Sequence, residues 1–157
     1  MRIKVDFDFI LKDSMFLNDL VLSAIDKNDF YEFLKSIATD TFHLSQQLVP
    51  VATGKLKKSG NLRSEGFNFI IEYNTRYAGY VHEIIGNKHK PPTQAKFLQE
   101  AFVQVMYNLI STYGEKNIPD FDVRMDISIE EGIKLIIMGG NDGSRLKGVS
   151  WRRFLGL

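Results

Sequence analysis

Residues 121–138 place the strongest constraint on the fold, because their pattern predicts two neighbouring strands of an antiparallel sheet. In residues 121–129 apolar and polar side chains alternate strictly, as they do in a strand with one buried face. Glu131 and Gly132 then provide a turn, and the mostly apolar residues 133–138 follow as a second strand. A link this short permits only antiparallel pairing of the two strands.

Two longer segments have the spacing of amphipathic helices. In residues 97–113 the apolar side chains recur on one face, with Thr93 as the expected N-cap and Gly114 as the end of the helix. A second helix is expected to begin near Asp29 and to end before Pro50, because the residue before a proline resists helical geometry. Helices and antiparallel strands together predict an α+β fold, with the helices on one face of the sheet.

The remaining patterns complete this α+β fold, a mostly antiparallel sheet packed against two long helices and one shorter helix. They predict strands at 3–9 and 67–74, a helix at 16–25 capped by Ser14, a short helix at 76–83, and loops at 60–66 and 86–92. A length of 157 residues suggests one domain. We therefore expect a single α+β domain that spans residues 1–139.

Residues 140–157 are expected to form an extended C-terminal arm or tail beyond this domain. The segment follows Gly139 and begins with glycine and polar residues, and Trp151 and Phe154 then appear among basic side chains. A hinge followed by apolar anchors would let the arm reach a surface beyond its own core. The alternative is that Trp151 and Phe154 fold back and seal the sheet of their own subunit.

The formal charge of +1 is distributed unevenly along the chain. Residues 53–96 carry eight Lys and Arg against three Asp and Glu, whereas the segments on either side are net acidic. A local positive band suits a polyanion or an acidic protein neighbour. The candidate interface or DNA-channel residues are Lys55, Lys57, Lys58, Arg63, Lys88 and Lys90. The alternative is a solvated, charged turn without a partner.

The sequence contains no pattern of catalytic, metal-binding or cofactor-binding residues, so an enzyme is not expected. His82 is followed by His89 seven residues later, which does not place two metal ligands on one helix face. Gly54 and Lys55 lack the other positions of a phosphate-binding loop, since Leu56 stands where a hydroxyl is needed. The chain has no cysteine, and no apolar run approaches the roughly 18 residues of a membrane span. Folding is expected in the cytoplasm.

Three short motifs follow one another after the second helix. They occupy residues 53–59, 77–83 and 95–101. The motif residues are Pro50, Thr53, Gly54, Leu56, Ser59, Tyr77, Tyr80, Glu83 and Phe97. In the first motif, Thr53 is expected to cap the turn that begins at Gly54. Leu56 is expected to anchor this turn to the core while the neighbouring lysines stay outside.

The second motif is expected to form part of a short helix. Tyr77 and Tyr80 lie three residues apart, so their rings are expected to be buried together with the hydroxyl groups at a wet rim. Glu83 is then expected to meet a basic partner, such as Lys55 or Arg76 of the same or the next subunit. Packing within one subunit is the simpler interpretation of all these residues.

In this order and at these separations, the motifs resemble those of the head–tail joining proteins (neck, tail-completion or minor capsid proteins) of tailed bacteriophages. The resemblance covers roughly residues 30–112. Ala52 departs from it, because such proteins often have an acidic residue there. Ile84 and Ile85 also depart, because a glycine-threonine turn often follows the glutamate directly. The neck, tail-completion and tail-terminator roles therefore stay open.

The resemblance implies a virion structural protein rather than an enzyme. It would form a ring, sixfold or twelvefold, at the head–tail junction of the virion after assembly in the host cytoplasm. The implied partners are further copies of the chain, a portal-side connector or head-completion protein, and a tail terminator or tail tube protein. The lumen would pass genomic DNA with only non-specific contacts. The alternative is a small nucleic-acid-binding module that uses the basic residues 53–63.

Overall fold

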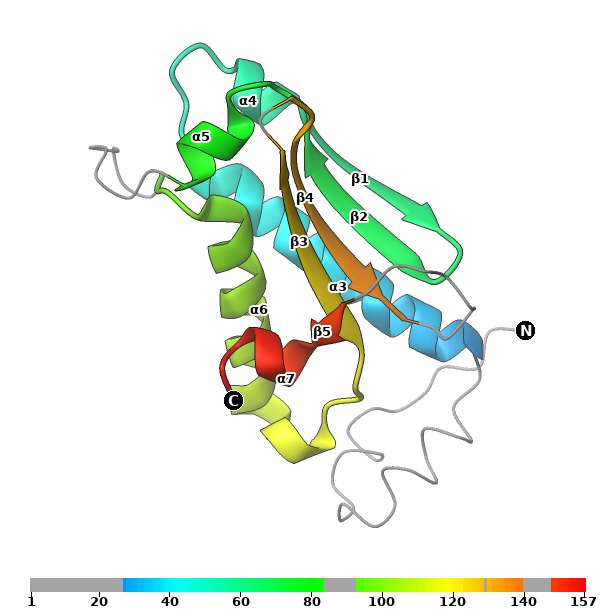
Figure 1. Ribbon diagram of the computed structural model, residues 1–157. Coiled ribbons are helices and arrows are strands. Elements are labelled where there is room, and N and C mark those ends of the chain that lie inside the picture. The colour runs from blue at the N-terminus through cyan, green and yellow to red at the C-terminus, as the bar shows by residue number, and fades with distance from the viewer. Residues whose placement is uncertain (1–26, 84–92, 129, 140–147) are drawn as a thin grey trace.

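The structure, a computed structural model, describes residues 27–83, 93–128, 130–139 and 148–157. In this part of the chain, five antiparallel strands form one sheet, and two of the five α-helices are long (Figure 1). The α+β class is therefore confirmed. The strand expected at 3–9, the helix expected at 16–25 and the loop expected at 86–92 lie outside the described residues.

The two long helices are α3 (Lys27–Leu48) and α6 (Phe97–Tyr113), and they pack against each other. Helix α3 ends two residues before Pro50, as expected. Gly114 ends α6, and its N–H donates to the carbonyl of Ile110. The cap expected at Thr93 is wrong: the N-cap is Lys96, which has a left-handed backbone (φ 57°) and gives no side-chain cap.

The sheet has the strand order β1-β2-β4-β3-β5. The strands are β1 (Gly60–Glu65), β2 (Asn68–Tyr73), β3 (Asp122–Ser128), β4 (Gly132–Met138) and β5 (Val149–Ser150). The expected hairpin is confirmed, since β3 and β4 pair antiparallel with Ser128 opposite Gly132. The loop expected at 60–66 is wrong, because most of it forms β1. As an edge strand with much exposed surface, β1 needs no alternation of apolar residues.

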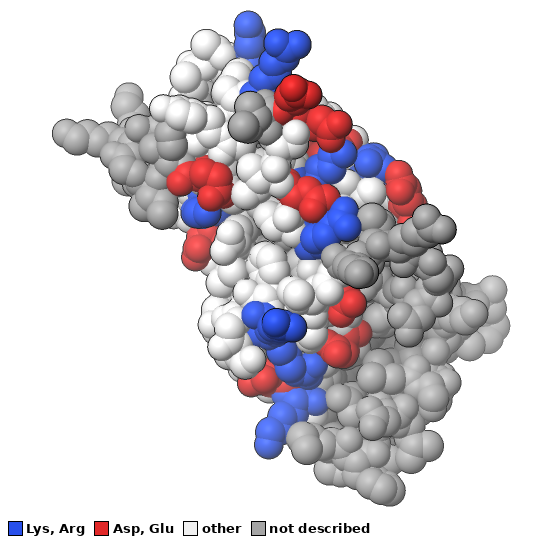
Figure 2. All heavy atoms as spheres, in the orientation of Figure 1, with Lys and Arg blue, Asp and Glu red and all other residues white. Residues whose placement is uncertain are grey.

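One face of the sheet and the two long helices enclose a single hydrophobic core. Phe69, Ile71 and Tyr73 of β2 belong to it, and all three are almost completely buried. Ile70, which interrupts the alternation in the sequence, lies on the opposite face in a small cluster with Ile136 and Met138. The same face also carries charge: basic and acidic side chains alternate over the sheet in Figure 2.

Short helices complete the described fold. They are α4 (Lys55–Lys58), α5 (Ala78–Glu83) and α7 (Trp151–Phe154), with a 3-10 turn at Glu115–Asn117. Figure 1 shows α4, α5 and the β3–β4 turn at the same end of the molecule, which we call the α4–α5 end. The register agrees, because Gly60, which follows α4, lies opposite Tyr73, and Tyr73 lies opposite Ile133.

Residues 148–157 pack against their own subunit, so the extended arm is wrong for this part of the chain. Trp151 is fully buried, and its ring stacks on Phe121 at 6.3 Å between centroids. Its indole N–H donates to the carbonyl of Pro119 at 3.0 Å. Phe154 meets Phe102 edge-on at 5.4 Å. Burial of the indole ring with its N–H satisfied favours this position over one in solvent.

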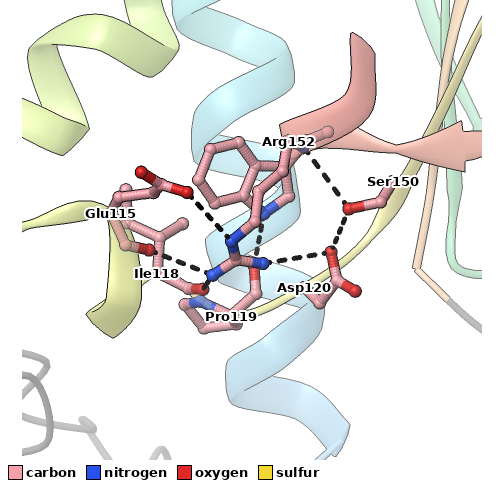
Figure 3. A network of polar contacts seen from close by, with 7 residues as sticks. Glu115, Ile118, Pro119, Asp120, Ser150 and Arg152 are labelled. Carbon is pink, nitrogen blue, oxygen red and sulfur yellow. Dashed lines mark hydrogen bonds and ion pairs between the residues drawn. The ribbon is translucent and has the colours of Figure 1, made fainter. Parts of the chain in front are cut away.

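Arg152 fixes the same segment through polar contacts (Figure 3). Its guanidinium donates to the carbonyls of Glu115 at 3.0 Å and Ile118 at 3.1 Å. It also lies 3.4 Å from the carboxylate of Asp120 and over the ring of Trp151, 4.4 Å from the ring centroid. These contacts join α7 to the segment that connects α6 and β3.

Candidate interaction surface

Helix α4 presents the expected lysines to solvent. Gly54 precedes it with a left-handed backbone (φ 83°), a conformation that glycine adopts without strain. Leu56 points into the core and is 5% exposed, which leaves Lys55, Lys57 and Lys58 outside. The Thr53 hydroxyl accepts from the N–H of Lys55 at 3.4 Å, a weak contact for a cap.

Fewer basic residues come together in the structure than the sequence predicts for the basic cluster. None of the three lysines of α4 forms an ion pair within the described part of the chain. Arg63 lies on β1 and forms ion pairs with Glu65 and Glu72 instead of joining them. Lys88 and Lys90 lie outside the described residues. Among the described residues of the expected cluster, those without an ion pair are therefore the three lysines of α4.

Tyr77, just before α5, and Tyr80 within it both face solvent, so the expectation of buried rings is wrong. Tyr77 is 41% exposed and Tyr80 is 67% exposed, whereas Ala78 and Gly79 are buried. The reason is the close approach of α5 to the sheet at Gly79, where a Cβ atom would lie 3.1 Å from Cγ2 of Ile127. The face with the smallest side chains packs inward, and the larger rings are turned outward.

A hollow of about 790 Å³ lies beside these tyrosines. Among the described residues, it is lined by Arg76 and Tyr77 before α5 and by Glu130 and Glu131 of the β3–β4 turn. Both glutamates are exposed, and within the described ranges neither forms an ion pair. Apart from the turn itself, no sequence pattern indicates this hollow, because its described walls come from two distant segments.

Within its own subunit, Glu83 meets a basic side chain other than the two expected, so the expectation of Lys55 or Arg76 of the same subunit is wrong. Its carboxylate forms an ion pair with Lys96 and a contact of 2.9 Å with Nδ1 of His82, rather than meeting Lys55 or Arg76. The N–H of Lys96 also donates to the carbonyl of His82 at 2.7 Å. The second and third sequence motifs are therefore joined directly, at the place where α5 meets the start of α6.

His82 is fully buried, and sequence reasoning had assigned it no role. Its Nε2 accepts from the N–H of Gln99 at 3.4 Å, and its ring meets Phe97 edge-on at 5.1 Å. With Nε2 as an acceptor, the proton of the neutral ring lies on Nδ1 and points to Glu83. Burial lowers the pKa of His82 from 6.5, and it outweighs the opposite effect of Glu83.

Acidification is expected to destabilise the fold through His82. Below pH 6.5 the unfolded chain binds a proton at this histidine, whereas the folded chain, with its lowered pKa, keeps the ring neutral. The free energy of unfolding is therefore highest above pH 6.5 and falls by up to about 1.4 kcal/mol for each pH unit below it, until the folded form is also protonated. Urea unfolding at several values between pH 7.5 and pH 5 measures this slope.

His82→Gln should flatten the pH dependence, even if its unfolding free energy at pH 7.5 is lower. His43→Gln is the matched control, because His43 is exposed on α3. An unchanged slope in the His82 variant would show that other groups cause the acid sensitivity.

The other motif residues, Phe97, Ser59 and Pro50, make contacts within their own subunit. Phe97 is fully buried, with its ring edge-on to Tyr73 at 5.1 Å. The Ser59 hydroxyl donates to the carbonyl of Leu56 at 2.7 Å and closes α4. Pro50 is half-buried after the end of α3.

Two further features of the described residues bear on function. They contain no group of three or more His, Asp or Glu that could hold a metal ion. Within the same ranges, none of the helices combines the length and the apolar character that crossing a bilayer requires.

Comparisons with protein-family models, curated proteins and solved structures found no match to this chain. The function is therefore inferred from the molecule's own sequence and surface.

Proposed function

We propose that this chain is a virion structural protein of a tailed phage and that copies of it form a ring at the head–tail junction. The ring, sixfold or twelvefold, would join a portal-side connector or head-completion protein to a tail terminator or tail tube protein. It would assemble in the host cytoplasm. The proposal begins from the order and spacing of the three sequence motifs.

The observation that supports it most is the exposure of motif side chains at the α4–α5 end. Three lysines and two tyrosines of the first two motifs point into solvent there. Exposed tyrosines are typical of protein interfaces, because the ring buries a large area and the hydroxyl finds a polar partner. Side chains that only packed their own subunit would lie inside it, as Leu56 and Phe97 do.

Binding to nucleic acid is the second candidate, and the unpaired lysines of α4 favour it. Such binding would be sequence-independent and would weaken steeply with salt. Two features weigh against a dedicated module: Arg63 is held by two carboxylates, and Glu130 and Glu131 add negative charge at the same end. Weak contact with DNA in the lumen of a ring is compatible with both candidates.

Purified protein is expected to form ring particles of six or twelve copies, because a repeated head-to-tail contact that closes gives cyclic symmetry. Light scattering measures the mass, and electron microscopy shows the ring, with a titration against duplex DNA at several salt concentrations alongside. A chain that stays monomeric at every concentration and binds DNA tightly at low salt would favour the second candidate.

A further inference from the structure

Among the described residues, two exposed groups of opposite charge at the α4–α5 end form no ion pair. Lys55, Lys57 and Lys58 form one group, and Glu130 and Glu131 form the other. In the described ranges no lysine of α4 lies within ion-pair distance of either glutamate. Figure 2 shows basic and acidic side chains over this end of the molecule. As far as the described residues go, the complementary charges of one subunit are both left to another molecule.

The hollow suits a cationic guest. Its described walls carry the carboxylates of Glu130 and Glu131 and the guanidinium of Arg76, which leaves a net charge of −1. The ring of Tyr77 adds an exposed aromatic surface, and the negative face of such a ring attracts a cation. A volume of about 790 Å³ leaves room for more than one side chain.

Helix α4 is held in a fixed shape by contacts with its own subunit. Leu56 anchors it to the core, and the side chain of Gln46 donates to the carbonyl of Lys57 at 3.1 Å. The N–H of Ser59 donates to the carbonyl of Lys55 at 3.0 Å. A pre-organised helix loses little conformational entropy when a partner binds it.

We propose that the hollow receives helix α4 of a neighbouring copy of this chain. The lysines of one copy then meet Glu130 and Glu131 of the next, and the same contact repeats head to tail around an axis. The occupant is a second copy because the matching charges are present on the chain itself. A phosphate backbone would meet the two glutamates unfavourably. This inference rests on the proposed ring and names the contact that closes it.

The test exchanges the charges of the two surfaces. The first variant is Lys55→Glu with Lys58→Glu, two residues one helical turn apart, and the second is Glu130→Lys with Glu131→Lys. Each variant alone places like charges in the contact, so the concentration needed for half-association should rise at least tenfold. Both an equimolar mixture of the two and a single chain with all four substitutions should associate like the wild type. Light scattering at low and high salt measures each association.

The matched control is Lys35→Glu with Arg153→Glu, which changes the net charge as much as the first variant but at exposed sites on α3 and α7. It should associate normally, and circular dichroism should show that every variant is folded. If the wild type forms rings and either contact variant still associates normally, the contact is overturned and the ring proposal stands. Failure of the mixture and the four-site chain to recover also overturns the contact. A wild type that never self-associates overturns both.

Discussion

Replacing Trp151 with alanine is expected to lower the free energy of unfolding by about 3–5 kcal/mol. The indole is fully buried, stacks on Phe121 and donates its N–H to the carbonyl of Pro119. Its loss leaves a cavity, a buried carbonyl without this donor, and the guanidinium of Arg152 without its aromatic neighbour. Urea unfolding followed by circular dichroism measures the effect.

Trp151→Phe separates packing from the hydrogen bond. It keeps an aromatic ring against Phe121, so the expected loss is smaller, about 1–3 kcal/mol. The chain has a single tryptophan, so the fluorescence of the wild-type protein also reports directly on this site. Emission typical of an exposed indole, or an alanine variant as stable as the wild type, would contradict the packing of residues 148–157 on their own subunit.

Replacing Gly132 with alanine is expected to cost about 2–5 kcal/mol of unfolding free energy. Its backbone has a φ of 93°, which disfavours any side chain. An added Cβ atom would also lie 1.9 Å from the carbonyl oxygen of Tyr73 on the neighbouring strand. That oxygen belongs to the backbone, so relief requires β2 and β4 to separate at this position. Thermal or urea unfolding gives the value.

Gly66→Ala is the control for this substitution. Gly66 also has a left-handed backbone (φ 59°), but a Cβ atom there would meet nothing within 4 Å. The control therefore carries only the conformational penalty, about 1–2 kcal/mol. Equal losses in the two variants would show that the contact with Tyr73 adds no cost.

The parts of the fold that could be predicted are those with a strong pattern. Residues 121–138 predicted the β3–β4 hairpin because strict alternation in the first strand is followed by a Glu-Gly turn and a short apolar run. Strand β1 was missed because it is defined by its backbone pairing with β2 and not by a pattern of side chains. Of its residues, only Leu62 is an apolar residue packed against the core, so no alternation appears in the sequence. The cap of α6 was missed because Lys96 holds its backbone through tertiary contacts with His82 and Glu83.

The candidate surface was predictable only in part. The outward lysines of α4 follow from one apolar residue, Leu56, in a short basic helix. The outward positions of Tyr77 and Tyr80 could not be predicted, because the inner face of α5 depends on how closely Gly79 approaches Ile127. The hollow could not be predicted, since it joins the segment before α5 to the β3–β4 turn.

The polar character of β1 has a consequence for the behaviour of the molecule in concentrated solution. An edge strand presents unpaired backbone groups, and charged side chains along it discourage fibril-like stacking of sheets from different molecules. Among the described strands, β1 lies at an edge of the sheet, and Arg63 and Glu65 supply such charges on it. At high concentration, copies of the protein should therefore resist aggregation by strand pairing at this edge, so that contacts between copies form through side chains.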